Sequence, residues 1–144
     1  MLERMIQLLK EHHTCVLATC SENRPHCSLM AYVADESGRV VHMITQRQSQ
    51  KCKNMRENPM VSFLVDTRQG KELSRMSRVC ALTVHGTYSL PTDPLDRTNA
   101  LNHLLEIHPH LEELASFSDA EVFSIKVASF LLLDGPLDAY FYEL

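Results

Sequence analysis

The sequence predicts a mainly β protein, a small six-stranded antiparallel barrel with a few helices, in a single domain spanning residues 1–144. Short apolar segments alternate with turn residues, and most connections between them are too short for a crossover helix. Helical patterns are inserted only after the third and fifth of these segments. An apolar content of 44% in 144 residues is enough for one core of ordinary size.

The first third of the chain is expected to form a helix and three strands. Residues 2–13 carry apolar side chains at helical spacing with charged residues between them, which is typical of an amphipathic helix. Residues 14–20, TCVLATC, are apolar on both faces and indicate a central strand covered on two sides. Residues 26–35 and 39–45 follow after short turns, so we expect an antiparallel meander.

The remaining two thirds are expected to alternate strands with helices. A Ser N-cap and a terminal Asn-Pro predict a helix over residues 49–58, and Pro91-Thr-Asp-Pro94 predicts the start of another that ends near residue 108. Gly86 is expected to mark a β-bulge. Residues 67–77 have no apolar periodicity and are expected to form an exposed loop. The other expected strands are residues 60–66, 78–90 and 121–133.

Composition and charge exclude several classes of function. The net charge is -4 and there is no basic stripe, so nucleic acid is not an expected partner. No apolar stretch is long enough to cross a bilayer, and the start of the chain does not have the pattern of a signal peptide, so we expect a soluble cytoplasmic protein without a membrane partner. Five cysteines, an odd number, are expected to be free thiols, of which Cys27 is the candidate for reactivity. The histidines show no closed zinc spacing, and no metal is expected.

The segment around Ser49 suggests an anion site. Ser49 is a good N-cap, and the free N–H groups of the first helical turn point at one spot together with the positive end of the helix dipole. Lys51 and Lys53 lie in that first turn, where the dipole disfavours a cation. A phosphate bound between the lysines and the amides explains their presence. The alternative is an ordinary solvated helix face.

Five segments of the chain resemble the FMN-binding split barrels related to pyridoxamine 5'-phosphate oxidase in their order and spacing. The family pattern has a strand ending in Leu-Ala-Thr, a turn with Pro, a strand along the flavin, a strand ending in Thr, and a helix that starts on Ser-Arg-Lys before Asn-Pro. The matching segments are Cys15-Val-Leu-Ala-Thr19, Arg24-Pro25-His-Cys-Ser-Leu-Met30, Val40-Val-His-Met-Ile-Thr45, Ser49-Gln-Lys51 and Asn58-Pro59-Met-Val-Ser-Phe63.

This resemblance implies an FMN site at the interface of a homodimer. The phosphate would be held by Ser49, Gln50 and Lys51 together with Thr45. The isoalloxazine ring would lie along the strand with Ser28, Leu29 and Met30, and Ile44 would face it from the next strand. His26 is either a flavin or substrate contact or a surface residue at the start of its strand.

Three departures from the family pattern separate this chain from the true oxidases. Gln50 replaces the phosphate-binding Arg and Ser28 replaces an Arg of the flavin strand, so two guanidinium contacts are missing. The Gly before the Pro of the turn is replaced, since Asn23-Arg24-Pro25 stands there. The chain ends in Tyr140-Phe-Tyr142 instead of an Arg-rich segment. These departures disfavour vitamin B6 oxidation. The resemblance implies an FMN-dependent reductase or oxidase with an unidentified small-molecule substrate, or alternatively a non-catalytic flavin- or haem-binding protein of the same fold. The aromatic tail either packs the barrel end or reaches the flavin pocket of a partner subunit.

Overall fold

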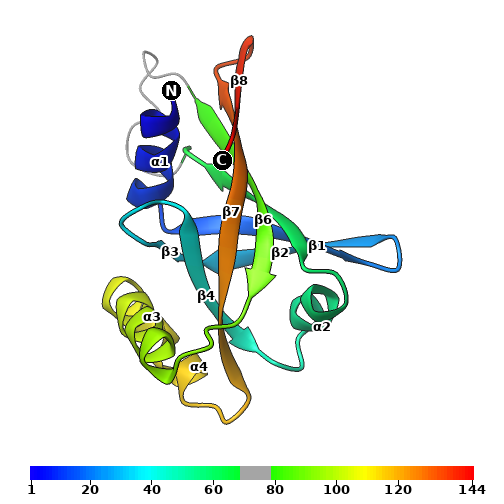
Figure 1. Cartoon of the computed structure of the whole chain (residues 1–144), viewed down its shortest axis with the longest axis vertical. Helices are drawn as coiled ribbons and strands as arrows, with labels where there is room; N and C mark the ends of the chain where they lie inside the picture. Colours follow the sequence, from blue (N-terminus) through cyan, green and yellow to red (C-terminus); the bar gives the residue numbers. More distant parts are fainter. Residues whose placement is uncertain (69–78) are drawn as a thin grey trace.

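In the computed structural model, which describes residues 1–68 and 79–144, one antiparallel sheet curls into a half-open barrel with helices on its outside (Figure 1). The predicted mainly β split barrel is therefore confirmed. The strands follow the order β2-β1-β5-β6-β7-β4-β3, and β8 pairs with β7. Their bounds are β1 Thr14–Ser21, β2 Arg24–Ala31, β3 Val33–Ala34, β4 Val40–Gln46, β5 Met60–Asp66, β6 Cys80–Ser89, β7 Ala120–Asp134 and β8 Asp138–Glu143.

The helices lie close to where the sequence places them. They are α1 Leu2–Glu11, α2 Gln50–Glu57, α3 Pro94–Ile107, the 3-10 turn η1 Pro109–Leu111, and α4 Glu112–Ala115. The predicted Ser49 cap of α2 is present, and α3 begins where the Pro91-Thr-Asp-Pro94 signal places it, with the Asp93 side chain accepting a hydrogen bond from the Leu95 N–H. Residues 69–77 of the expected loop over residues 67–77 lie outside the described residues.

The expected strand over residues 26–35 is broken at Tyr32. Its first part, β2, pairs with β1, and its second part, β3, pairs with β4. Both antiparallel pairings of the predicted meander are present, but its middle strand is split, so β4 pairs with β3 and β7 and not with β2. The cause is Tyr32 itself: its ring is fully buried, its hydroxyl donates to the Leu9 carbonyl at 2.7 Å, and its N–H bonds to the His13 carbonyl.

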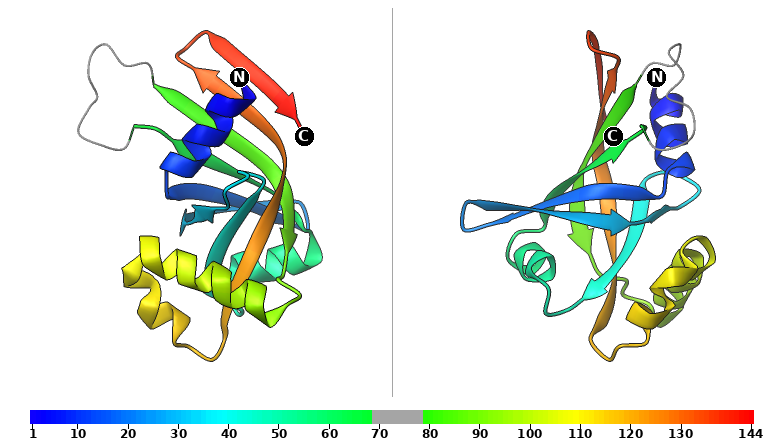
Figure 2. Two further views of the ribbon diagram at one scale, coloured as in Figure 1. Left: turned by 60° about the vertical axis from the view of Figure 1, so that its left-hand side comes forward. Right: turned by 180° about the vertical axis from the view of Figure 1, so that it is seen from behind.

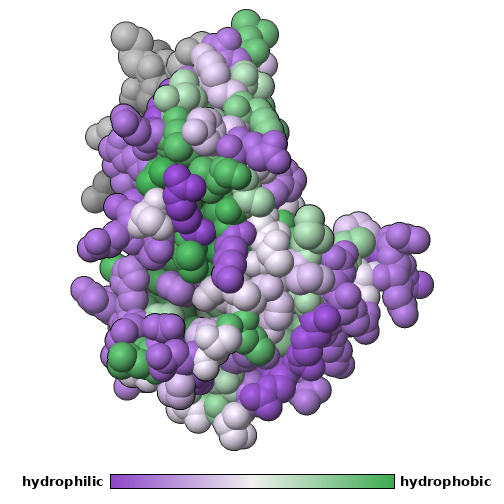
Figure 3. Space-filling model, viewed as in Figure 1, coloured by the Kyte–Doolittle hydropathy of each residue, from purple (hydrophilic) through white to green (hydrophobic). Residues whose placement is uncertain are grey.

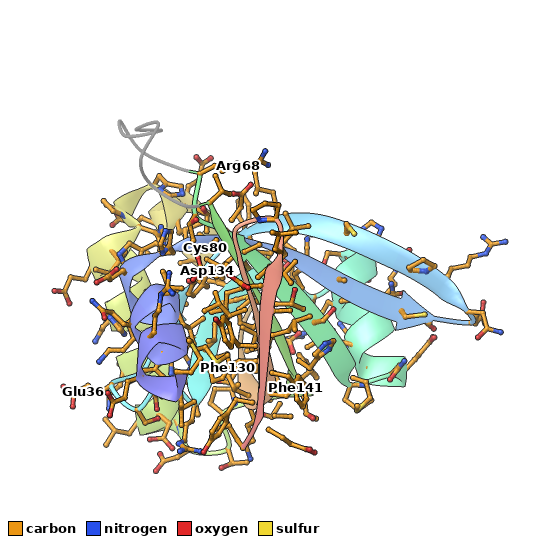
Figure 4. All side chains as sticks on the ribbon, turned by 90° about the horizontal axis from the view of Figure 1, so that it is seen from above. Glu36, Arg68, Cys80, Phe130, Asp134 and Phe141 are labelled. Atoms are coloured by element: carbon orange, nitrogen blue, oxygen red, sulfur yellow. The ribbon has the colours of Figure 1, made fainter. Side chains whose placement is uncertain are left out.

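Two further expectations about burial do not hold in the single chain. Leu17 of β1 is fully buried, but its neighbour Val16 is 37% exposed, so β1 is covered on one face only. The aromatic tail does not pack a barrel end. It forms β8, in which Phe141 is 62% exposed, whereas Phe130 on the adjacent β7 is fully buried (Figure 4).

Two local features that the sequence indicated are confirmed. The β1–β2 hairpin, which projects from the barrel in Figure 2, turns at Glu22 and Asn23 with φ of 52° and 62°, the conformation of a two-residue type I′ turn. The pairing of β6 with β7 shifts register between His85 and Gly86. A Cβ at Gly86 would lie 2.5 Å from the carbonyl oxygen of Lys126, so this bulge requires glycine.

The core has two parts. The larger part fills the curl of the sheet and is closed at one end by α1. Arg4 of α1 forms a 2.8 Å ion pair with Asp134 and a hydrogen bond to the Cys80 sulfur. Figure 4 shows Cys80 and Asp134 close to each other. The smaller part lies outside the sheet, between α3 and the strands β3, β4 and β7. It consists of Val33, Ile44, Ala100, Leu104, Ala120 and Val122. This second cluster fixes α3, η1 and α4 beside the end of β4.

Candidate functional site

The end of β4 and the start of α2 are joined by hydroxyl groups. The Ser49 Oγ accepts a hydrogen bond from the Cys52 N–H at 3.3 Å and lies 3.1 Å from the Thr45 Oγ1. Thr45 is buried, Lys51 is half-buried and Lys53 is exposed. The α2 start therefore has the N-cap geometry that leaves first-turn N–H groups free for an anion.

A cavity of about 270 Å³ opens directly beside this helix start. It is bounded by β2, by the end of β4, by the first turn of α2 and by the η1–α4 segment. The lining residues are Leu29, Met30, Ala31, Ile44, Thr45, Gln46, Ser49, Lys51, Leu111 and Leu114. Six of the nine residues predicted from the sequence thus converge on one cavity.

The other three predicted residues do not line this cavity. His26 and Ser28 are half-buried on β2, further toward the hairpin tip than Met30. The Gln50 side chain is exposed and donates to Asn54 Oδ1 at 2.8 Å, so it is directed along α2. Gln50 could contribute to the site through its backbone, whereas the arginine that the family carries at this position would reach a phosphate with its side chain.

Four lining residues were not predicted individually: Ala31, Gln46, Leu111 and Leu114. The last two lie in the region 108–120, which was expected to shape the pocket but whose contacts could not be assigned. Both are half-buried on the η1–α4 segment and face the apolar cluster around Ile44. The segment is anchored by His108, whose ring Nε2 lies 2.9 Å from the Tyr32 carbonyl oxygen. The leucine spacing was visible in the sequence, but nothing local indicated which strand this helical turn would cover.

A buried polar network holds α2 against the barrel. The Cys52 thiol donates to Glu121 Oε2 at 3.0 Å, and the Tyr88 hydroxyl donates to the other oxygen of the same carboxylate. Burial and then the bond to Glu121 raise the pKa of both the Cys52 thiol and the Tyr88 hydroxyl, so both stay protonated at neutral pH. On the other side of α2, Asn54 donates to the Thr19 hydroxyl at 3.1 Å. The helix start is thus held from two sides.

The cavity combines an apolar slot with one polar, cationic end. Lys51 is the only charged residue among the described residues that line it. The hydroxyls of Ser49 and Thr45 lie at the same end, and Met30, Ile44, Leu111 and Leu114 form apolar walls. Such a site suits a molecule with a flat apolar body and an anionic end.

Neither a metal centre nor a membrane span is found in the described chain. Within residues 1–68 and 79–144, no group of three or more His, Cys, Asp or Glu side chains could hold a metal ion. None of the helices in this part of the chain is long and apolar enough to cross a bilayer.

Fold and site together define a split-barrel protein with a capped helix start beside an apolar slot. The sequence profile of the pyridoxamine 5'-phosphate oxidase family matches residues 1–134, and the chain belongs to this family. Among curated protein sequences, none gives a match.

Solved structures similar to this chain include proteins described as binding haem or a flavin. The heme binding protein from Mycobacterium smegmatis superimposes with a TM-score of 0.83 at 15% identity, over 98% of this chain and 57% of that protein. An FAD-binding protein from Mesorhizobium loti superimposes with a TM-score of 0.74 at 16% identity, over 92% of this chain and 93% of that protein. General Stress Protein 26 from Bacillus anthracis superimposes with a TM-score of 0.69 at 22% identity, over 99% of this chain and 98% of that protein. At these identities the similarity shows the fold alone.

Proposed function

We propose that this protein is an FMN-binding flavoprotein and that it acts as a reductase or oxidase on a small substrate. The observation that carries the proposal is the convergence of Leu29, Met30, Ile44, Thr45, Ser49 and Lys51 on one cavity. A phosphate at the α2 start would meet the Lys51 ammonium, the Ser49 hydroxyl and the free N–H groups of the first turn. The residues present thus fit the anionic end of FMN.

The rest of the cofactor fits the apolar part of the slot. Met30 and Ile44 offer apolar faces to a flat ring, and Leu111 and Leu114 would exclude water from one side. Strand N–H and C=O groups can recognise the polar edge of a flavin without any particular side chain. A bound flavin supplies the redox chemistry itself, and the protein contributes binding, orientation and exclusion of water.

We also propose that a second copy of the chain completes this site. A cavity of about 270 Å³ is small for a ligand of this size, since such sites usually measure roughly 300–1,000 Å³. Leu29, at the rim of the cavity, is 79% exposed. It is the first of a row of residues that runs across neighbouring strands on the outer face of the sheet. Strand pairing sets the members of this row side by side: Leu29, Val16, Leu64, Thr83, Leu131 and Phe141. An apolar row that continues from the cavity rim is a suitable homodimer interface.

Haem binding without turnover is the alternative for the same fold. It is supported by the neighbour described as a heme binding protein. However, no histidine is among the described residues that line the cavity, and Lys51 with a capped helix start favours a phosphate. The cytoplasmic location expected from the sequence stays a prediction.

Titration with FMN and with riboflavin tests the proposal, because the two differ only in the phosphate. We expect FMN to bind with quenched flavin fluorescence and riboflavin to bind at least tenfold more weakly, which corresponds to about 1.4 kcal/mol. Lys51→Gln should weaken the binding of FMN but not that of riboflavin. The matched change Lys53→Gln, on an exposed side chain, should leave the affinity for both flavins unchanged. Equal binding of the two flavins would refute the phosphate site. A Soret band on haem titration without flavin binding would favour the alternative.

Turnover is tested separately on the FMN-loaded protein. Anaerobic mixing with NADH or NADPH should bleach the flavin absorbance if the protein is a reductase. A protein that binds FMN tightly, is not reduced by either nucleotide and consumes no oxygen with amine or alcohol substrates would be a flavin-binding protein without these activities.

A further inference from the structure

A second and larger hollow lies on the face of the molecule shown in Figure 3, between α3 and the β3–β4 turn. Its volume is about 1220 Å³ and it shares no lining residue with the smaller cavity. The outer faces of β4 and β7 form its floor, α3 forms one wall, and the end of α1 with the β3–β4 turn forms the other. In Figure 3, green and pale surface between the helices is bordered by purple polar side chains. We refer to this hollow as the histidine groove.

Three imidazole rings line the histidine groove. His42 lies on the floor, where its Nδ1 is 2.8 Å from the hydroxyl oxygen of Ser124 on the neighbouring strand. His103 lines the groove from α3, and His13 lines it from the segment before β1. All three are half-buried. Apolar side chains, among them Val40, lie between them.

The carboxylates of the groove have other partners or lie at its rim. The Asp35 carboxylate already accepts hydrogen bonds from the Ser37 hydroxyl and from the backbone N–H groups of Arg39 and Val40. Glu36 and Asp96 are exposed at the rim. The titratable and charged groups around the groove are Lys10, His12, His13, Asp35, Glu36, His42, Asp96, His103, His108 and Lys126. The Asp35 charge still acts on His42, but among the described residues no hydrogen bond joins a groove carboxylate to one of the three rings.

The protonation state of the groove follows from this arrangement. Burial lowers the pKa of His42, and His103 lowers it further, against the opposing effect of Asp35. Burial and then His108, His12 and His103 lower the pKa of His13. Both rings are therefore neutral at neutral pH, and an anion placed among them would favour their charged form.

We propose that the histidine groove binds a small organic carboxylate. The carboxylate would lie among His42, His103 and Lys126, and the organic part of the ligand would contact the apolar wall formed by Val40, Ala100 and Ile107. The apolar wall favours an organic acid over inorganic phosphate, which would leave that wall exposed to water. This site is independent of the proposed flavin site.

Binding to the groove has a defined pH dependence. Because the anion raises the pKa of the imidazoles that it contacts, the complex takes up protons. Affinity is then highest below the pKa of the free rings, which is lowered from 6.5, and it decreases as the pH rises toward the raised pKa of the complex. Uptake of one full proton would change the affinity by about tenfold per pH unit within this window.

Benzoate and its uncharged analogue benzamide test the proposal, with histidine ring resonances followed by NMR. Benzoate should shift the resonances of His42 and His103, bind at least tenfold more tightly than benzamide, and bind more tightly at pH 5.5 than at pH 8. Lys126→Gln, on an exposed side chain that should not affect folding, should weaken benzoate severalfold, and His42→Gln should reduce the pH dependence. Lys53→Gln, outside the groove, should have no effect.

Competition separates this site from the flavin site. FMN should not displace benzoate, because the two hollows share no lining residue. Displacement by FMN, equal binding of benzoate and benzamide, or a benzoate affinity that is insensitive to both pH and Lys126 would overturn the proposal. Failure of FMN to bind would leave it intact.

Discussion

The hydroxyl groups of Thr45 and Ser49 lie 3.1 Å apart and join the end of β4 to the start of α2. The Ser49 oxygen also accepts the Cys52 N–H, and the Cys52 thiol donates to the buried Glu121. One chain of polar contacts therefore runs from the strand through the helix cap into the barrel. The proposed phosphate site is held in shape by the fold itself.

Substitutions of Ser49 should separate the stability of α2 from anion binding. Ser49→Ala removes the N-cap and should lower the free energy of unfolding by about 1 kcal/mol. Ser49→Asp restores a good N-cap but places a negative charge at the proposed phosphate site. We expect its urea midpoint near that of the native protein and its FMN affinity reduced at least tenfold. Unchanged FMN binding by Ser49→Asp would argue against a phosphate at this helix start.

Leu29→Glu should disrupt self-association. Leu29 is 79% exposed on the outer sheet face, so the change should leave the fold intact while placing a charge in the proposed interface. Sedimentation velocity should show a dimer for the native chain and a monomer for Leu29→Glu. Leu95→Glu, at a site on α3 that is 63% exposed, is the matched control and should stay dimeric. A native chain that sediments as a monomer at high concentration would contradict the dimer.

Acid should destabilise the protein through the half-buried His42. The pKa of His42 in the folded state lies below its ordinary value of 6.5, mainly because of burial, so the unfolded chain binds more protons in that range. The resulting stability is present above pH 6.5 and is lost as the pH falls through the folded-state pKa. Urea midpoints between pH 7.5 and 5.5 should decrease, and His42→Gln should decrease less. An equal decrease for both proteins would exclude His42 as a contributor.

Gly86→Ala should be strongly destabilising although it adds a single methyl group. The new Cβ would lie 2.5 Å from the Lys126 carbonyl oxygen and 2.6 Å from the Ile125 Cγ2, and the backbone oxygen cannot yield without displacing β7. We expect a loss of about 1–3 kcal/mol in the free energy of unfolding. Thr87→Ala, at the next position of β6, should cost less. Calorimetric melting of both variants checks the difference.

Thiol labelling should distinguish the cysteines by burial. Cys27 is exposed, whereas burial raises the pKa of Cys15 to about 12 and Cys52 and Cys80 are also buried. Under native conditions iodoacetamide should modify Cys27 rapidly and the three buried thiols only after unfolding. Peptide mass spectrometry gives the order. Rapid modification of Cys15 in the folded protein would contradict the packing of β1.

Local signals in the sequence were sufficient for most elements and for much of the site. The Ser49 cap, the Asp93 cap and the Gly86 bulge each follow from a residue type with a specific backbone role. The helix start at Ser49 and Lys51 was indicated by local signals, whereas the other residues that converge on the small cavity were implied by the resemblance of five segments to the family. Whether they bind a cofactor stays a prediction.

The features that sequence reasoning missed depend on tertiary contacts. Tyr32 interrupts a strand because its ring enters the core and its hydroxyl meets Leu9, and neither partner is near in sequence. Leu111 and Leu114 line the cavity only because α3 returns the chain to β4. The tail becomes β8 because β7 extends beyond β4, so that residues 129–134 have a free edge on the side opposite β6.

Leu29 belongs both to the rim of the small cavity and to the outer row of the sheet. If one side chain serves both surfaces, cofactor uptake and subunit association form a single coupled equilibrium. Dilution would then release flavin. Saturating flavin would strengthen dimerisation by the same factor by which dimerisation strengthens flavin binding. The protein could thus lose its colour on dilution without losing its fold.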